Sequence, residues 1–370
     1  MKKRITGIVL ILACIVSFGF AEEVEIKPFR IHTPRSIGMG NAYNAISTGY
    51  ESFWINPAGL RTEKTEINFF NLAVTVLGNP GDVFSAGQSM FDADGGSNIL
   101  SSLKQVVTGS GVGLNAGGGF SWIGKGFGAG IFNSFDLYMQ GDPFPAGVEG
   151  YVDNTISLMF GYALSIPLPF GMKVTAGADI RPSLKLRGAI DARMVEKLLL
   201  EDNADVMKYF TDILKNKYFA FPVDIGAKVE LPLGFVVSMS ANDIFGKYFG
   251  GDTDYYVNWG LNFGAAWQPD LKAAANIIKP TISLELSNIN RIIAEETGFW
   301  RELKVGCEVA LFKSIVLLWA GLDGGYPSFG GGFDIGVFEI GVAYGTTEYG
   351  RYLGDCPVPH LTFELAIRLD

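Results

Sequence analysis

Side chains that could carry out catalysis or bind a metal ion are scarce in this chain of 370 residues. Its two histidines are His32 and His360, and neither has the spacing of a metal ligand to another histidine or to a cysteine. His360 follows Asp355 by five residues, but no serine has a nucleophile-like context and nothing supplies an oxyanion hole. We therefore expect no enzyme activity, no metal site and no cofactor.

Nucleotide and nucleic-acid binding are not expected either. Gly38-Met39-Gly40 has Tyr43 where a dinucleotide-binding fingerprint needs its third glycine, and the other glycine-rich runs lack the strand-turn-helix setting of a phosphate loop. The chain carries 29 basic against 38 acidic residues, a formal net charge of −9. Its bulk electrostatics therefore exclude a nucleic-acid partner.

Three cations share one face of the clearest strand in the sequence, which runs from Met172 to Leu186. Arg181, Lys185 and Arg187 follow the alternation of this strand, opposite a row of apolar residues. If that face lines the lumen of a barrel, they could bind the carboxylate of an amphiphilic ligand by charge-assisted hydrogen bonds. The alternative is electrostatic balance against acidic residues on the same lumenal side. These acidic residues are Asp179, Asp224 and Glu230.

The N-terminus predicts secretion through a membrane. Three basic residues precede an apolar run from 5 to 20, which is too short to span a bilayer. We expect a signal peptide over residues 1–21, cleaved after Ala21. A lipoprotein cut before Cys14 is the alternative, although the apolar run continues past that residue.

Alternation is the rule in the rest of the chain, which is 48% hydrophobic over its full length but has no second long apolar run. From residue 255 to 267, every bulky apolar side chain falls on one face. This face reads Tyr255, Val257, Trp259, Leu261, Phe263, Ala265 and Trp267. A strand of a soluble β-sandwich would alternate in the same way, but aromatic residues at both ends of the face are typical of the two interfaces of a membrane.

About fourteen such strand candidates follow residue 60. Short turns, as at 124–126 and 232–234, alternate with long connections, as at 78–111 and 188–218, which is typical of outer-membrane barrels. The stretch from 269 to 279 is an exception, because a short turn is expected there. We predict an all-β fold: a transmembrane antiparallel β-barrel of about 14 strands over residues 61–370. The spacing of apolar residues between 191 and 217 predicts helical extracellular loops that cap its outer mouth.

A barrel of this width needs a plug, and the segment from 22 to 60 is available for it. This segment holds two motifs, Gly38-Met39-Gly40-Asn41-Ala42-Tyr43 and Asn56-Pro57-Ala58-Gly59-Leu60. Together they resemble the N-terminal hatch of the FadL-like family of outer-membrane transporters for long-chain fatty acids and other hydrophobic compounds. The resemblance implies passive uptake of such a molecule across the outer membrane. The acidic pair common before the second motif is replaced here near Thr48 and Gly49.

Apolar side chains of the predicted hatch are the next candidates for contact with the ligand. Phe53 and Trp54 could line an apolar pocket for its tail, or they could only fix the plug in the lumen. The resemblance further implies that cargo leaves sideways through a distortion of the third strand, from 127 to 139. Asn133 interrupts the lipid-facing row of that strand, while Gly128 and Gly130 leave room on its other face. Alternatively, Asn133 lies at the depth of the membrane interface, where polar groups are tolerated.

The expected partners are a fatty acid or another hydrophobic molecule, outer-membrane lipid, and the barrel-assembly machinery. That machinery would recognise the closing strand from 361 to 370, which departs from the usual pattern by ending in Asp370 and not in an aromatic residue. The main alternative to transport is a binding or docking barrel of the same architecture that presents its loops to other proteins or surfaces.

Overall fold

The computed structural model describes residues 24–83, 85, 104, 107–109, 111–141, 146–192, 214–250, 253–271 and 276–369. Several predictions lie outside these residues: the signal peptide with its cleavage after Ala21, the alternative cut before Cys14, and most of the helical pattern between 191 and 217. Among the helices that the structure describes, none has the length and apolarity to cross a bilayer.

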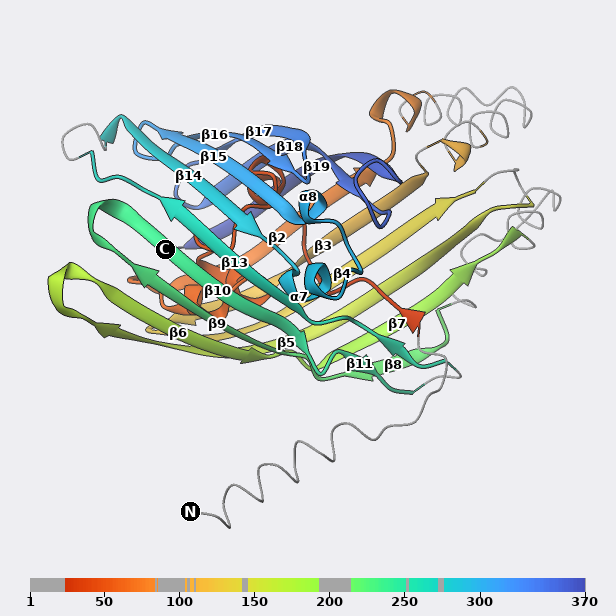
Figure 1. Ribbon diagram of the computed structural model, residues 1–370, viewed down its shortest axis with the longest axis horizontal. Coiled ribbons are helices and arrows are strands. Elements are labelled where there is room, and N and C mark those ends of the chain that lie inside the picture. Colours follow the sequence, from red (N-terminus) through yellow and green to blue (C-terminus); the bar gives the residue numbers. More distant parts are fainter. Residues whose placement is uncertain are drawn as a thin grey trace, which may run out of the picture.

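Fourteen wall strands form a closed antiparallel β-barrel (Figure 1), which confirms the predicted fold class. The last strand pairs with the first, and the ladder between β4 and β5 completes the closure. Two of the fourteen are each divided into two segments, β6 with β7 and β8 with β9, so the wall has sixteen segments. The segments are β2 Glu66–Leu77, β3 Val112–Gly124, β4 Phe127–Gln140, β5 Glu149–Pro167, β6 Lys173–Ile180, β7 Ser183–Ile190, β8 Lys217–Ala220, β9 Val223–Glu230, β10 Phe235–Ile244, β13 Gly260–Trp267, β14 Ile278–Leu286, β15 Leu303–Leu311, β16 Val316–Asp323, β17 Tyr326–Asp334, β18 Phe338–Glu348 and β19 Pro357–Leu369.

Two prolines each split one wall strand into two halves. β6 and β7 both pair with β5 and are separated at Pro182, the irregularity predicted from the sequence. β8 and β9 are separated at Pro222 in the same way. Proline has no N–H to donate to a ladder, but both carbonyls are used: Leu158 and Arg181 each donate a backbone N–H to one of them at 2.9 Å. The wall therefore stays continuous across both breaks.

The wall is apolar outside and polar inside, as the alternation predicted. On β5, Phe160 and Leu164 are exposed on the outer face, whereas Asp153 and Ser157 are buried on the inner face. An apolar exterior of this kind needs lipid around it, and a closed ladder leaves no strand edge unpaired.

One predicted wall strand is shorter than expected. The alternating row from Tyr255 to Trp267 enters the wall only at Gly260, and Val257 is buried. The ladder with the preceding wall strand ends at the pair of Asn242 with Gly260. Tyr255 and Tyr256 pair instead with residues 24 and 25, so the prediction of one continuous lipid-facing strand was wrong.

Connection lengths differ between the two ends of the barrel. Two residues join β3 to β4, and single short turns at 168–172 and 231–234 join the next pairs at that end. The connection 268–277 is the longer one at the same end, where the sequence predicted an exception. Long connections lie at the opposite end, which we call the outer mouth.

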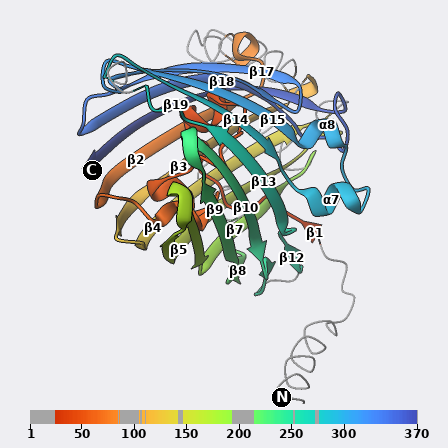
Figure 2. The same cartoon turned by 60° about the vertical axis from the view of Figure 1, so that its left-hand side comes forward.

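The segment before β2 fills the lumen (Figures 1 and 2). It begins at the outer mouth with the two-residue strand β1 (Val24–Glu25), which pairs in parallel with β12 (Tyr255–Tyr256), itself paired with β11 (Lys247–Tyr248). Three short helices follow, α2 (Pro34–Gly38), η1 (Gly49–Phe53) and η2 (Pro57–Leu60). We call residues 33–60 the hatch and residues 24–32 the leading stretch.

Candidate functional site: the lumenal hatch and its cavity

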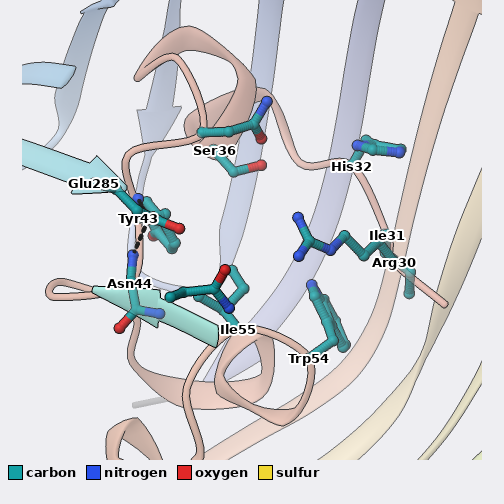
Figure 3. A pocket seen from close by; sticks show the side chains of 11 residues that line it. Arg30, Ile31, His32, Ser36, Tyr43, Asn44, Trp54, Ile55 and Glu285 are labelled. Carbon is teal, nitrogen blue, oxygen red and sulfur yellow. Dashed lines mark hydrogen bonds between the residues drawn. The ribbon is translucent and has the colours of Figure 1, made fainter. Parts of the chain in front are cut away.

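Polar groups of the wall hold the first hatch motif. Glu285 on β14 accepts the backbone N–H groups of Tyr43 and Asn44, both at 2.8 Å (Figure 3). Asn41 has a positive φ and its amide donates to Asp323 at 2.8 Å. Hydrogen bonds to carboxylates are stronger than neutral ones. The loop from Gly40 to Asn44 is thus fixed by charges that belong to the barrel.

An ion pair fixes the helix before that loop. Arg35 in α2 makes two hydrogen bonds to Glu308 on β15, at 2.6 and 2.9 Å, and the indole of Trp319 donates to the same carboxylate at 2.9 Å. Thr33 caps the helix, because its hydroxyl accepts the N–H of Ser36. The bidentate geometry sets both the position and the rotation of α2.

Glycines on the lumenal face of the wall allow the hatch to pack closely against it. A Cβ atom added at Gly306 or Gly321 would lie 2.5 Å from backbone atoms of Met39 and Gly40. Gly177 and Gly226 lie equally close to Pro57 and Asn56 of the second motif. A side chain at any of these positions would push the hatch away from the wall, so both motifs pack against glycine.

The second motif is a capped turn. The side chain of Asn56 accepts the N–H of Ala58 at 3.1 Å, and its amide donates to the side-chain oxygen of Asn44 at 2.9 Å. Pro57 occupies the first position of η2, where a missing N–H is tolerated. The second motif is therefore bound to Asn44, the residue that directly follows the first motif.

Aromatic residues of the hatch form one cluster with β4. Phe53 is fully buried and Trp54 is 2% exposed, and the Trp54 ring meets Phe132 edge-on at 5.3 Å. Tyr50 stacks on Phe132 and donates its hydroxyl to Glu364 on β19 at 2.8 Å. Phe53 therefore fixes the plug in this conformation, whereas Trp54 also reaches the cavity described next.

A small cavity of about 30 Å³ remains between the leading stretch and the hatch (Figure 3). Its lining combines the Arg30 guanidinium and the His32 ring with the apolar side chains of Ile31, Trp54 and Ile55. The rest of the lining is Ser36, Asn41, Tyr43, Asn44, Asn262 and Glu285. This volume holds about one or two water molecules, so the conformation is closed to any larger molecule.

Two charged groups line this cavity, the guanidinium of Arg30 and the carboxylate of Glu285, which already accepts the backbone N–H groups of Tyr43 and Asn44. No hydrogen bond or ion pair of the Arg30 guanidinium occurs within the part of the chain that the structure describes. Burial and then the neighbouring His360 lower the pKa of His32 to about 3, so His32 is neutral near pH 7. The arrangement can therefore attract one anionic group next to apolar side chains.

Neither a protein-family model nor a curated protein sequence matches this chain. Solved structures do resemble it. A deltaS2S3 mutant of the TodX monoaromatic hydrocarbon channel has 13% identity and a TM-score of 0.50, over 90% of this chain and 97% of that one. The Ralstonia pickettii toluene transporter TbuX has 10% identity and a TM-score of 0.47, over 91% and 98%. A Pseudomonas aeruginosa FadL homologue has 9% identity and a TM-score of 0.44, over 92% and 99%.

The chain has the fold of a FadL-like channel. The fold that the two hatch motifs implied is thereby confirmed. Within this FadL-like fold, both motifs lie in the lumen and contact the wall, as described above.

The three predicted ligand cations of the FadL-like wall all have acidic partners. Arg181 is 1% exposed and lies 2.5 Å from Asp243 and 3.4 Å from Asp224. Lys185 and Arg187 both contact Asp153, at 3.3 and 2.5 Å. These contacts fit the alternative of lumenal charge balance, and a role of the three cations in ligand binding stays a prediction.

Arg30 was not among the residues singled out from the sequence. It lies in the segment before the strands, where no alternation shows which side chains face a cavity. A weak signal was present, because Arg30 is a lone cation between the apolar residues Phe29 and Ile31 in a stretch that had to lie in the lumen.

The third wall strand of the FadL-like fold, β4, is regular. It pairs with β3 and with β5 along its whole length, and no unpaired stretch interrupts it. The amide of Asn133 donates to the side chain of Asn154 at 2.6 Å and to the carbonyl of Thr155 at 3.3 Å. Gly128 faces Phe53 and Leu60, so the hatch fills the room beneath the strand, whereas a Cβ at Gly130 would approach Phe132 and Ser121. The structure has no distortion here, and an exit at these residues stays a prediction.

Proposed function

We propose that this chain is an outer-membrane transporter for passive uptake of hydrophobic or amphiphilic molecules, with long-chain fatty acids as its cargo. The observation that carries the proposal is the cavity at the hatch, where the guanidinium of Arg30, unpaired within the described residues, lies beside Trp54, Ile31 and Ile55. A carboxylate with an apolar tail satisfies both features, because charge and apolar lining then each have a partner. Secretion by a signal peptide over residues 1–21 is part of this proposal.

Passage requires the hatch or the leading stretch to move. The closed cavity is too small for a fatty acid, and the ties to Glu285, Glu308 and Asp323 are hydrogen bonds that can break and re-form without covalent change. The start of the leading stretch is held by backbone hydrogen bonds to Asp254 and Tyr256 and by the ion pair of Glu25 with Arg291, which can also break and re-form. We expect the leading stretch to move first and to open the cavity toward the outer mouth.

The name of the TodX relative points to a second cargo class, monoaromatic hydrocarbons. Such molecules carry no charge and gain nothing from an unpaired guanidinium. Arg30 therefore favours an anionic amphiphile over a neutral hydrocarbon as the cargo of this chain.

Uptake decides between transport and mere binding. The chain should be expressed in a bacterial strain that lacks its own fatty-acid importer, and uptake of labelled long-chain fatty acid and labelled toluene should be compared. We expect uptake of the fatty acid to be restored. Binding of fatty acid without uptake would make the chain a binding or docking barrel, and uptake of toluene alone would exclude the anionic cargo.

A further inference from the structure

Three tyrosines surround one ammonium group at the outer mouth. The Nζ atom of Lys27, in the leading stretch, lies 3.3 Å from the ring centroid of Tyr349, 5.5 Å from that of Tyr138 and 5.6 Å from that of Tyr151. The rings also contact one another, since the centroids of Tyr138 and Tyr349 are 5.0 Å apart. Distances of up to about 6 Å define a cation–π contact, and several rings around one cation form an aromatic cage. We call these three residues the tyrosine cage.

The tyrosine cage opens onto a cleft. The cleft has a volume of about 550 Å³ and shares Tyr138 and Tyr151 with the cage. Its other lining residues are Gln140, Gly141, Gly147, Glu149, Gly150 and Arg187. These positions lie toward the outer ends of β4, β5 and β7, so the cleft is on the outer-mouth side of the barrel.

Charges around the tyrosine cage balance only when a cation occupies it. Asp136 and Asp153 act on Lys27, and Glu149 lines the cleft. Lys185 and Arg187 supply two positive charges, both directed to Asp153. Without Lys27, these three acidic and two basic side chains have formal charges that sum to −1.

Lys27 is an imperfect occupant of the cage. Although exposed to lumenal space, it is surrounded by the protein, and this burial lowers the pKa of Lys27 to about 7 despite the nearby Asp136 and Asp153. The amine thus loses its charge in a sizeable fraction of molecules near neutral pH. A quaternary ammonium ion keeps its charge at every pH and is also less strongly hydrated, so the cage suits it better.

We propose that the tyrosine cage is a binding site for organic ammonium ions, whose resident occupant is Lys27. An external ammonium ion that enters through the cleft replaces Lys27, and the leading stretch then loses its attachment to β4 and β5. This site is separate from the cavity at Arg30, and it selects for positive charge where that cavity selects for negative charge.

Tetramethylammonium is the probe that tests the site, and Lys27→Ala is the variant that empties it. We expect the purified Lys27→Ala barrel to bind tetramethylammonium about tenfold more tightly than the unaltered protein, as measured by calorimetry. Neopentyl alcohol, a neutral molecule with a similarly branched quaternary centre, should not bind. Adding Tyr349→Leu to Lys27→Ala should remove the binding, whereas Tyr349→Phe should keep most of it.

A second measurement uses the unaltered chain and so does not depend on the folding of a variant. Tetramethylammonium should accelerate the reaction of the Lys27 amine with an acylating reagent, followed by peptide mass spectrometry, and the neutral alcohol should not. The proposal is wrong if Lys27→Ala folds but binds tetramethylammonium no more tightly than the unaltered protein does. It is also wrong if tetramethylammonium does not change the reactivity of the Lys27 amine. In either case the cage only holds Lys27 in place. Neither result depends on whether the chain transports fatty acids.

Discussion

Five cations of the lumen form two groups with opposite surroundings. Those of the wall, Arg181, Lys185 and Arg187, each contact an aspartate carried by another strand. Those of the leading stretch, Lys27 and Arg30, have no ion pair within the described residues and face a cage of rings or a cavity. In the first group a ligand would compete with an aspartate, whereas in the second it would not compete with any acidic partner among the described residues.

The difference follows from the cost of burying charge. A charge inside the wall must have a partner, because an unpaired ion in a region of low dielectric loses its hydration without compensation. A ligand carboxylate at Arg181 would have to displace Asp243 or Asp224 and leave it unpaired. A ligand carboxylate at Arg30 would displace no acidic partner among the described residues, although the cavity must first open to admit it.

The largest expected effect comes from breaking a wall pair. Arg181→Ala leaves Asp224 and Asp243 without their cation and should lower the free energy of unfolding by about 3–5 kcal/mol, measured by urea unfolding in detergent. Lys173→Ala is the matched control, since its pair with Glu230 is solvent-exposed and should contribute about 0–1 kcal/mol. A stable Arg181→Ala barrel that no longer binds fatty acid would instead restore the ligand role predicted from the sequence.

An effect of intermediate size is expected from the leading stretch. Arg30→Ala should weaken fatty-acid binding by about 1.5–3 kcal/mol, because the carboxylate loses a charge-assisted hydrogen bond. Stability should change little, since no described group is left unpaired. Binding is measured by displacement of a fluorescent fatty acid, with Arg187→Ala as the comparison. If Arg187→Ala weakens binding more than Arg30→Ala does, the two groups of cations have exchanged roles and the cavity is not the site.

The barrel could be predicted from the sequence because strand alternation, tight turns and Pro182 are local features. The hatch could be predicted from two short motifs.

The acidic partners of the wall cations could not be predicted from the sequence. The contact between Arg187 and Asp153, for example, depends on the register of β5 and β7, which pairs residues 34 positions apart. The tyrosine cage could not be predicted for the same reason. Its rings come from β4, β5 and the connection after β18, and no local sequence pattern links them to Lys27. The implied kink of the third strand came from the resemblance alone, and β4 lacks it.

The smallest expected effect concerns His32, the uncharged neighbour of Arg30. Its pKa is lowered from 6.5 to about 3, so the unfolded chain takes up a proton between these pH values while the folded chain does not. This difference makes the folded state less stable as the pH falls from about 6.5 toward 3. His32→Gln removes this titrating group, so the variant should gain about 1 kcal/mol of stability relative to the unaltered protein at pH 5.8 compared with pH 7.5, measured by urea unfolding at both values. An equal pH dependence in both proteins would mean that His32 titrates normally, and Arg30 would then share its cavity with a second cation at low pH.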